Sequence, residues 1–248
     1  MKLRGGRLLA VIPARGGSKG LPDKNIRPFA GHPLIVHSLL FAAMCPEIER
    51  TIVSTDSEEI AKVAREAGAD VPFLRPAELA RDDTAMWPVL RHALAAVEEA
   101  EGARYDALLL LDPTSPAREP ADVRDAWNSF LDSEDADGII AVSQPDFNPV
   151  WHCVVDKDGW MAPLIPDADN FARRQDVPPV YRINGALYIW RAAFLRTETD
   201  SWRRGRHLIY VTPDDRAMSI DDENEFLRAE LLVRSGMVRL PWLSLGRS

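Results

Sequence analysis

The stretch RLLAVIPARGGSKGLPDKN, residues 7–25, joins a short apolar run to a glycine-rich, basic loop. The run from Arg7 to Ile12 shows no polar alternation and is stopped by Pro13, which is typical of a buried strand. Ligands gather at the carboxyl ends of the strands in a parallel α/β sheet. Residues 14–25 are therefore predicted to form a ligand-binding loop at the end of the first strand.

The chemistry of this loop indicates an anionic ligand. Its glycines let backbone N–H groups approach anionic oxygens, and Arg15, Lys19 and Lys24 add positive charge. A Walker A motif is excluded because Ser18 precedes Lys19 and Gly20 follows it. A dinucleotide fingerprint is excluded because its glycines open directly into a helix, whereas here the helix is expected well after Gly20. The loop is long enough to wrap a triphosphate; the alternative is an ordinary solvated turn.

Strand-like and helix-like segments alternate along the rest of the chain. Strands are expected at residues 51–54, 107–111, 138–142, 186–190 and 207–212, and helices at 33–44, 58–67, 84–101, 119–131 and 222–234. The run from Ala107 to Leu111 is the most apolar in the chain, as expected for a strand covered on both faces. This rhythm predicts one doubly wound α/β domain over residues 1–248.

The alternation of strand-like and helix-like segments stops between residues 144 and 185, where prolines are frequent. The segment is too long for a plain connection, and it is predicted to form a small inserted lobe with a short hairpin around residues 154–161. Its apolar side chains, among them Trp151 and Trp160, need a surface on which to pack.

Composition narrows the class of protein. The 248 residues are 46% hydrophobic and 27% charged with a net charge of -8, so we expect no nucleic-acid partner. No apolar run approaches the ~20 residues of a membrane-spanning helix, and the run ended by Pro13 favours a strand over a signal peptide. The two cysteines, Cys45 and Cys153, favour a reducing cytoplasm over a disulfide framework or a zinc site.

Two aspartates at segment ends suit a metal that accompanies a triphosphate. Asp112 follows the most apolar strand, and Asp221 precedes the last helix. The alternative for Asp112 is a turn aspartate before a proline. Asp222 is expected to cap the last helix, and Asp56 is expected to hold the loop or cap a helix rather than bind metal.

These motifs resemble those of the acylneuraminate cytidylyltransferases, a family that includes the CMP-sialic acid synthetases. The resemblance runs through nearly the whole chain in order, over residues 14–25 (ARGGSKGLPDKN), 53–57 (VSTDS), 74–79 (LRPAEL), 113–116 (PTSP), 182–186 (RINGA) and the acidic segment before the last helix. It implies a three-layer α/β/α, Rossmann-like nucleotidyltransferase fold of the glycosyltransferase-A type, with a mostly parallel sheet and an inserted dimerisation lobe over residues 144–185.

The resemblance also implies a reaction. CMP is expected to pass from CTP to the anomeric hydroxyl of a sialic-acid-like 2-keto-3-deoxy sugar acid, with release of pyrophosphate and with Mg²⁺ held by Asp112 and Asp221. The residues that match the nucleotide-binding motif are Ala14, Arg15, Gly16, Gly17, Ser18, Lys19, Lys24, Asn25 and Arg75. Arg15, Lys19 and Lys24 are expected to be catalytic, because they would neutralise the triphosphate.

The sugar acid is expected to contact Asp112, Arg174, Arg182 and Asn184, where arginine is suited to gripping a carboxylate. The alternative for the arginines is a solvated surface loop. Two departures from the family leave the sugar open: Asp112 stands where Gln is usual, and Ser219 replaces the first carboxylate of a common Asp-Ile-Asp motif.

A homodimer is expected from the same resemblance, with no nucleic-acid or membrane partner. Two alternatives stay open at this point. One keeps the chemistry but uses another sugar acid, an amino-sugar phosphate or a nucleotide other than CTP. The other is a non-catalytic nucleotide-binding protein, and the loss of the carboxylate at Ser219 is the feature that supports it.

Overall fold

The computed structural model describes residues 6–18, 20–166, 170, 171, 173–197 and 201–244. Within these residues no helix has both the length and the apolar character needed to cross a membrane.

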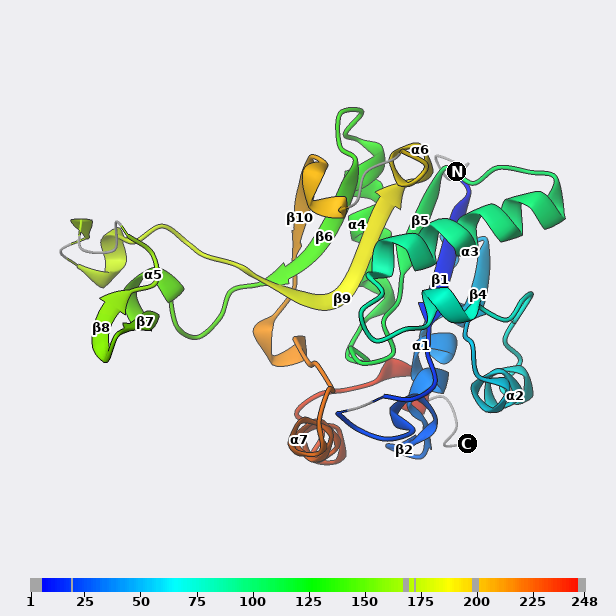
Figure 1. Ribbon diagram of the computed structural model, residues 1–248, viewed down its shortest axis with the longest axis horizontal. Coiled ribbons are helices and arrows are strands. Elements are labelled where there is room, and N and C mark those ends of the chain that lie inside the picture. The colour runs from blue at the N-terminus through cyan, green and yellow to red at the C-terminus, as the bar shows by residue number, and fades with distance from the viewer. Residues whose placement is uncertain (1–5, 19, 167–169, 172, 198–200, 245–248) are drawn as a thin grey trace.

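A six-stranded sheet forms the centre of the described chain, in the order β10-β6-β9-β5-β1-β4 (Figure 1). Its strands are β1 (Leu8–Pro13), β4 (Arg50–Ser54), β5 (Ala107–Leu110), β6 (Gly138–Ser143), β9 (Arg182–Arg191) and β10 (His207–Val211). Neighbouring strands are parallel except where β9 pairs antiparallel with β5 and β6. The mostly parallel sheet predicted from the apolar runs is confirmed.

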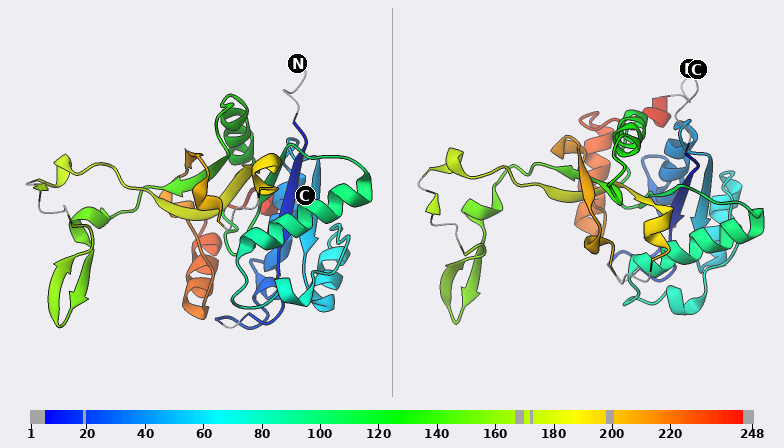
Figure 2. Two further views of the ribbon diagram at one scale, coloured as in Figure 1. Left: turned by 45° about the horizontal axis from the view of Figure 1, so that its top comes forward. Right: turned by 90° about the horizontal axis from the view of Figure 1, so that it is seen from above.

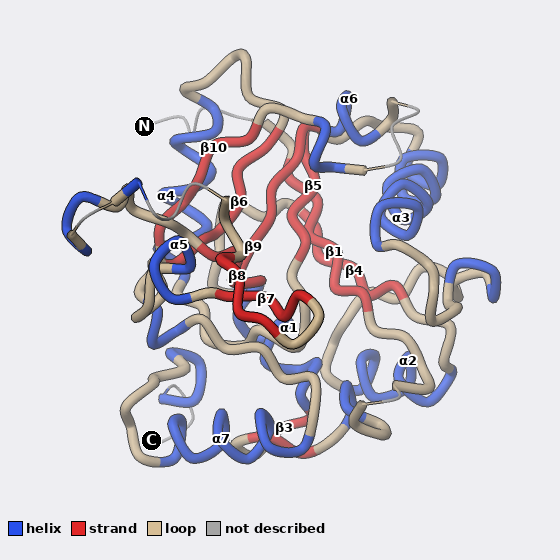
Figure 3. The backbone as a smooth tube through the Cα atoms, turned by 60° about the vertical axis from the view of Figure 1, so that its left-hand side comes forward, coloured by secondary structure: helices blue, strands red, loops and turns tan. Residues whose placement is uncertain are grey.

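Helices cover both faces of this sheet, because successive side chains of a strand point to opposite faces. Leu8, Ala10 and Ile12 pack with α1 (Leu34–Ala43), α2 (Glu58–Glu66), α4 (Pro120–Leu131) and α7 (Glu223–Arg234). Leu9 and Val11 pack on the other face with α3 (Met86–Glu101) and α6 (Ala192–Leu195). Figure 3 shows the strands between α3 on one side and α4 on the other, which confirms the three-layer α/β/α fold.

Local sequence explains where the helices begin. Ser57 caps α2 by accepting the N–H of Ile60 at 3.3 Å. The helix predicted from Thr84 begins instead at Met86. Pro88 has no N–H to bond the carbonyl four residues earlier, so it fits only within the first turn of a helix. Residues 84 and 85 are thereby left in the loop before α3.

The segment between β6 and β9 leaves the sheet and projects away from the main body (Figures 1 and 2). It contains α5 (Pro149–His152) and a hairpin of β7 (Val154–Lys157) and β8 (Trp160–Pro163), followed by the short 3-10 helix η4 (Arg174–Asp176). The remaining short elements are β2 (Pro28–Phe29), β3 (His32–Pro33) and the 3-10 helices η1 (Lys24–Ile26), η2 (Ala77–Leu79), η5 (Trp202–Arg204), η6 (Asp214–Arg216) and η7 (Pro241–Ser244).

Candidate active site

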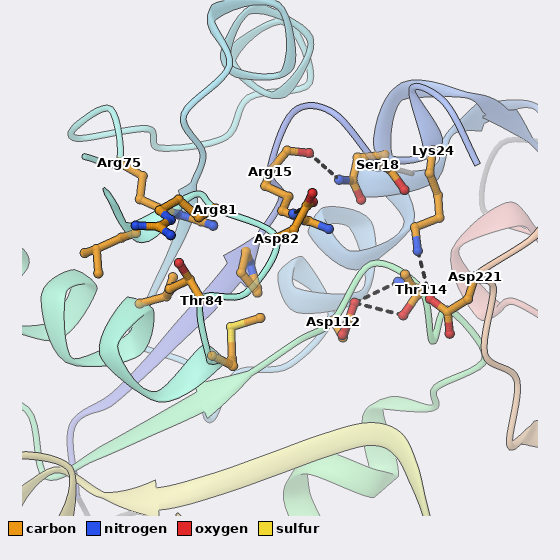
Figure 4. A pocket seen from close by; sticks show the side chains of 15 residues that line it. Arg15, Ser18, Lys24, Arg75, Arg81, Asp82, Thr84, Asp112, Thr114 and Asp221 are labelled. Carbon is orange, nitrogen blue, oxygen red and sulfur yellow. Dashed lines mark hydrogen bonds and ion pairs between the residues drawn. The ribbon is translucent and has the colours of Figure 1, made fainter. Parts of the chain in front are cut away.

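A polar pocket of about 280 Å³ opens at the carboxyl ends of β1, β4 and β5 (Figure 4). Seven residues predicted from the sequence line it: Arg15, Ser18, Lys24, Asn25, Arg75, Asp112 and Asp221. They come from four segments that are far apart in the chain. Parallel packing of β1 between β4 and β5 brings the ends of these strands to one edge of the sheet.

The glycine loop is held in shape by its own chain and by β4. The N–H of Gly16 donates to Oδ1 of Asp56 at 3.0 Å, and the amide of Asn25 donates to the carbonyl of Arg15 at 3.2 Å. Gly17 has φ of 66°, a conformation that favours glycine. A Cβ at Gly20 would collide with the carbonyl of Asp221, so the loop passes directly against the segment before α7. The prediction that Asp56 holds the loop is confirmed.

Lys24 and Asp221 form an ion pair on this edge. The Nζ of Lys24 donates to Oδ1 of Asp221 at 2.9 Å, and Ser219 donates its hydroxyl to Oδ2 at 2.7 Å. Partial burial disfavours the charged carboxylate, but the bonds from Lys24 and Ser219 lower the pKa of Asp221 below its ordinary value. Asp222 accepts the N–H of Glu225 at 2.8 Å, which confirms that Asp222 caps α7.

Asp112 lines the pocket and has one carboxylate oxygen bonded within its own turn. Its Oδ1 accepts the N–H and the hydroxyl of Thr114, at 3.1 and 2.9 Å. Its Oδ2 has no hydrogen-bond partner among the described residues. The turn that carries Asp112 is also tied to the segment that carries Asp221, because the N–H of Ile220 donates to the carbonyl of Thr114 at 3.0 Å.

An ion pair between Arg216 and a buried aspartate of α4 holds the segment that leads to Asp221. Arg216 donates both of its terminal nitrogens to Asp122 near the start of α4, at 2.5 and 3.0 Å. Asp122 is buried, and it also accepts the N–H of Glu119 in the capping box of α4. A bidentate pair of this kind has a defined geometry. The segment that carries Asp221 is therefore anchored to the start of α4.

Arg75 and Arg15 supply the positive wall of the pocket. Arg75 is buried and donates to the hydroxyl and the carbonyl of Ser54 at the end of β4. Burial lowers the pKa of Arg75 to about 10. Arg15 pairs with the carboxylate of Asp82 across the pocket (Figure 4).

Residues 79–86 form a wall that the sequence motifs did not predict. Leu79, Arg81, Asp82, Thr84 and Met86 all line the pocket. The charged run Arg81-Asp82-Asp83 was the available signal, but it reads equally well as a solvated turn before a helix.

The other predicted nucleotide-binding residues that the structure describes do not line this pocket. Ala14 is buried and bonds Ser54 through its backbone, whereas Gly16 and Gly17 line a cavity of about 190 Å³ on the other side of the loop. Lys19 lies outside the described residues, as does the side chain of Arg174. The roles assigned to them stay predictions.

The predicted sugar-binding residues of β9, Arg182 and Asn184, do not line the polar pocket. Arg182 donates to Asp214 at 2.9 Å and lines a separate cavity of about 790 Å³ beside α7. The side chain of Asn184 donates to Thr212 at 2.7 Å and accepts the N–H of Ala186 at 3.1 Å. Of the predicted sugar-binding residues with a described side chain, Asp112 is therefore the one that lines the polar pocket.

An aromatic pocket adjoins the polar one and shares Asp112 and Met86 with it. This cavity of about 160 Å³ is otherwise lined by Trp87, Leu90, Leu110, Tyr188, Trp190 and Trp202. Tyr188 stacks on Trp190 with ring centroids 5.3 Å apart. The buried indole nitrogens of Trp87 and Trp190 have no hydrogen-bond partner in the described structure. The two pockets together offer a polar, charged compartment and an apolar one, with a carboxylate between them.

The donor set fits a magnesium ion that arrives with phosphates. Within the described residues, no group of three or more His, Cys, Asp or Glu is placed to hold a metal alone. Mg²⁺ is usually held by one or two carboxylates together with substrate phosphates. Asp112 and Asp221, which both line the pocket, match that arrangement.

Comparisons with known proteins identify a family for this chain. A family model described as cytidylyltransferase matches residues 9–215. Post-translational flagellin modification protein B of Campylobacter coli is 34% identical over 227 residues, which cover 92% of this chain and 95% of that protein. A CMP-N,N'-diacetyllegionaminic acid synthase of Legionella pneumophila is 37% identical over 185 residues, 74% of this chain and 77% of that protein.

One solved structure shows the same fold. A CMP:2-keto-3-deoxy-manno-octonic acid synthetase complexed with CTP superposes with a TM-score of 0.68 at 17% identity. The match covers 93% of this chain and 99% of that one. At this level of identity the likeness concerns the architecture alone.

Proposed function

The chain belongs to the cytidylyltransferase family, and we propose that it transfers CMP from CTP to the anomeric hydroxyl of a sialic-acid-like 2-keto-3-deoxy sugar acid. The sugar oxygen forms a bond to the α-phosphorus as the bond to the β-phosphate oxygen breaks. The products are a CMP-sugar and pyrophosphate, and the hydroxyl proton passes to water. The family resemblance drawn from the motifs is confirmed by these relatives.

The observation that carries the proposal is the convergence of cations and carboxylates in one pocket. Arg15 and Lys24 on the glycine loop, and Arg75 at the end of β4, provide positive charge for a triphosphate. We assign Lys24 to the α-phosphate, where charge develops during transfer, and Arg15 to the departing pyrophosphate. Serine and asparagine side chains of the loop, Ser18 and Asn25, help to orient the nucleotide.

Magnesium is proposed as the cofactor, held by Asp112 and Asp221 with the phosphates. When bound, it offsets the charge of the triphosphate. Lys24 holds Asp221 before the nucleotide arrives. We propose that Lys24 exchanges this carboxylate for a phosphate oxygen when CTP binds, which releases Asp221 toward the metal.

The aromatic pocket suits apolar substituents of the sugar acid. Acylamino groups carry a methyl group, which packs on aromatic rings. Trp87, Tyr188 and Trp190 supply such rings, and Asp112 joins this pocket to the nucleotide pocket. Because relatives at 36% and 37% identity are named for a diacetylated sugar acid, we propose an N-acylated acceptor.

The projecting segment is proposed to form a homodimer. Its exposed apolar side chains include Trp160 and Met161, which are 78% and 80% exposed. A patch of this kind is typical of a surface that is covered by a partner. We place the reaction in the cytoplasm, where both free cysteines, Cys45 and Cys153, would stay reduced.

A pyrophosphate-release assay tests the proposal. The purified chain is incubated with Mg²⁺, each of the four ribonucleoside triphosphates and a panel of nonulosonic and octulosonic acids. Release that requires CTP and an N-acylated acid is expected. Release with another nucleotide or with an amino-sugar phosphate would redirect the substrate assignment. Tight CTP binding without product across the panel would favour a non-catalytic nucleotide-binding protein.

A further inference from the structure

Arg118 is a fully buried cation at the edge of the sheet that carries the proposed active site. It lies in the turn between β5 and α4 and is 0% exposed. None of its described hydrogen bonds goes to a carboxylate. Burial lowers the pKa of Arg118 to about 10, so the side chain is still charged at neutral pH. The carboxylates of Asp112 and Asp122 offset part of the cost of burying this charge, although neither accepts a hydrogen bond from it.

The guanidinium joins three separate segments. Nη2 donates to the carbonyl of Asp112 at 2.5 Å, and Nε donates to the carbonyl of Ala186 on β9. Nη1 donates to the hydroxyl of Ser38 on α1 at 3.1 Å. The guanidinium also lies over the ring of Phe41, 5.8 Å from its centroid. The rigid fork of arginine serves all three acceptors at once, which the single ammonium of lysine does less well.

These bonds fix the residue that separates the two pockets. The backbone of Asp112 is held by Arg118 and by the N–H of Ser115, and its Oδ1 is held by Thr114. Its remaining freedom is the direction of Oδ2, which has no partner among the described residues. Holding the carbonyl therefore fixes the backbone from which this carboxylate projects.

The three hydrogen bonds of Arg118 form a clamp between the turn after β5, the strand β9 and the helix α1. Close packing around this clamp leaves little room for the two backbone segments to move. Gly185, next to the Ala186 carbonyl, has φ of 74°, and a Cβ there would approach Oγ of Ser115 to 2.5 Å. The turn after β5 and the strand β9 are thus in direct contact beside Arg118. A change in the length of the Arg118 side chain cannot be absorbed by moving either segment alone.

We propose that Arg118 is a positioning residue for the transfer reaction, acting through the backbone of Asp112 to aim its free carboxylate oxygen at the metal and the sugar acid. This inference rests on the proposed function. Arg118 touches neither substrate, and none of the family motifs quoted above includes it. Groups that orient metal-binding side chains typically change activity or metal affinity by about 10–100-fold when they are replaced.

A double-mutant cycle tests the proposal with Arg118→Lys, Asp112→Asn and the combined variant. For each protein, kcat and KM for CTP are measured, together with Mn²⁺ affinity in the presence of CTP by electron paramagnetic resonance. Arg118→Lys is expected to lower kcat and Mn²⁺ affinity by about 10-fold or more, with KM for CTP nearly unchanged. In the Asp112→Asn background, Arg118→Lys is expected to cost little more, because both changes remove the same interaction.

Arg124→Lys is the matched control, because it makes the same change at an exposed arginine of α4 that pairs with Asp125. It is expected to leave both Tm and kcat nearly unchanged. If Arg118→Lys does not fold, Arg118→Gln, which keeps a donor, takes its place in the cycle. Losses that add in the double variant, or a lower Tm with normal kcat and Mn²⁺ affinity, would overturn the proposal. If the wild-type chain transfers no CMP at all, the proposed function fails, while the Mn²⁺ measurements still decide the role of Arg118.

Discussion

Lys24 and Asp221 are joined by a hydrogen-bonded ion pair of 2.9 Å across a sequence separation of 197 residues. The pair links the glycine loop to the segment before α7. Its lysine is 12% exposed and its aspartate 65% exposed, so the cation is fixed within the pocket wall and the carboxylate faces solvent. The proposed phosphate-binding charge and the proposed metal-binding charge therefore neutralise each other in this pair.

Replacement of Lys24 tests its assignment to the α-phosphate. Lys24→Ala is expected to lower kcat by about 100-fold or more, because a preorganised charge at the reacting group is lost. Thermal unfolding should stay close to that of the wild-type chain, since Lys24 is not part of the apolar core. Lys62→Ala, which removes an exposed lysine of α2, serves as the control and should leave kcat unchanged. Near-normal turnover of Lys24→Ala would remove its proposed role.

Replacing Asp221 is expected to affect activity, whereas replacing its neighbour Asp222 is expected to affect stability. Asp221→Asn should lower kcat and raise the Mg²⁺ concentration needed for half-maximal rate, with little change in unfolding free energy. Asp222→Ala should lower the unfolding free energy by about 1 kcal/mol, because it removes the cap of α7, and should leave kcat near normal. Steady-state kinetics and urea unfolding on both variants check this. The reverse pattern would exchange the roles assigned to the two residues.

The aromatic pocket is expected to control the choice of sugar. Trp202→Ala opens this pocket, whose rings pack at the side of Asp112 away from the nucleotide loop. We expect KM for an N-acylated sugar acid to rise about 10-fold, while KM for CTP in the same protein stays constant. A parallel measurement with a non-acylated octulosonic acid provides the contrast. Equal changes in KM for both acids would show that the pocket does not recognise the acyl group.

The hairpin of the projecting segment is expected to hold two copies together. Replacing Trp160 and Met161 with serine should shift the chain from dimer to monomer in sedimentation equilibrium, because both side chains are largely exposed in the single chain. Leu231→Ser on α7 is the control, since Leu231 is 67% exposed on a different element. A wild-type chain that sediments as a monomer would contradict the proposal directly.

His37 makes stability depend on pH. Nδ1 accepts the indole N–H of Trp242 at 3.0 Å, so the neutral ring carries its proton on Nε2 and donates it to the carbonyl of Phe29. Burial lowers the pKa of His37 to about 4 from 6.5. Between these values the unfolded chain binds more protons than the folded chain, so stability is lost as the pH falls. The loss levels off below pH ~4 at about 3 kcal/mol.

Urea unfolding between pH 4 and pH 8 measures this effect. His37→Gln is expected to flatten the part of the curve between pH ~4 and ~6.5, because the titrating group is removed. His32→Gln is the control: His32 packs edge-on against His37 but is exposed, and its removal should leave most of the slope in place. An unchanged slope in His37→Gln would assign the pH dependence to other groups.

The fold could be predicted because its strands and caps are local features of the sequence. The runs at residues 8–13 and 107–110 are wholly buried, and Ser57 and Asp222 cap the helices that follow them, as expected. The start of α3 was predicted wrongly because the apolar period continues back to Thr84, and the constraint imposed by Pro88 carries no periodic signal. Residues 79–83 of the pocket wall were missed for another reason, because their charged run is equally typical of a solvated turn.

Sequence alone determined the kind of chemistry, because glycine, lysine and aspartate at strand ends restrict which ligands a chain of this type can hold. Only the tertiary structure decided which of these groups meet. It brought Lys24 and Asp221 together and separated Arg182 from them. It also revealed the position of Arg118, which donates hydrogen bonds to the backbone carbonyls of Asp112 and Ala186. Every residue has such a carbonyl, so no pattern of side chains could mark the ones that a buried guanidinium would bind.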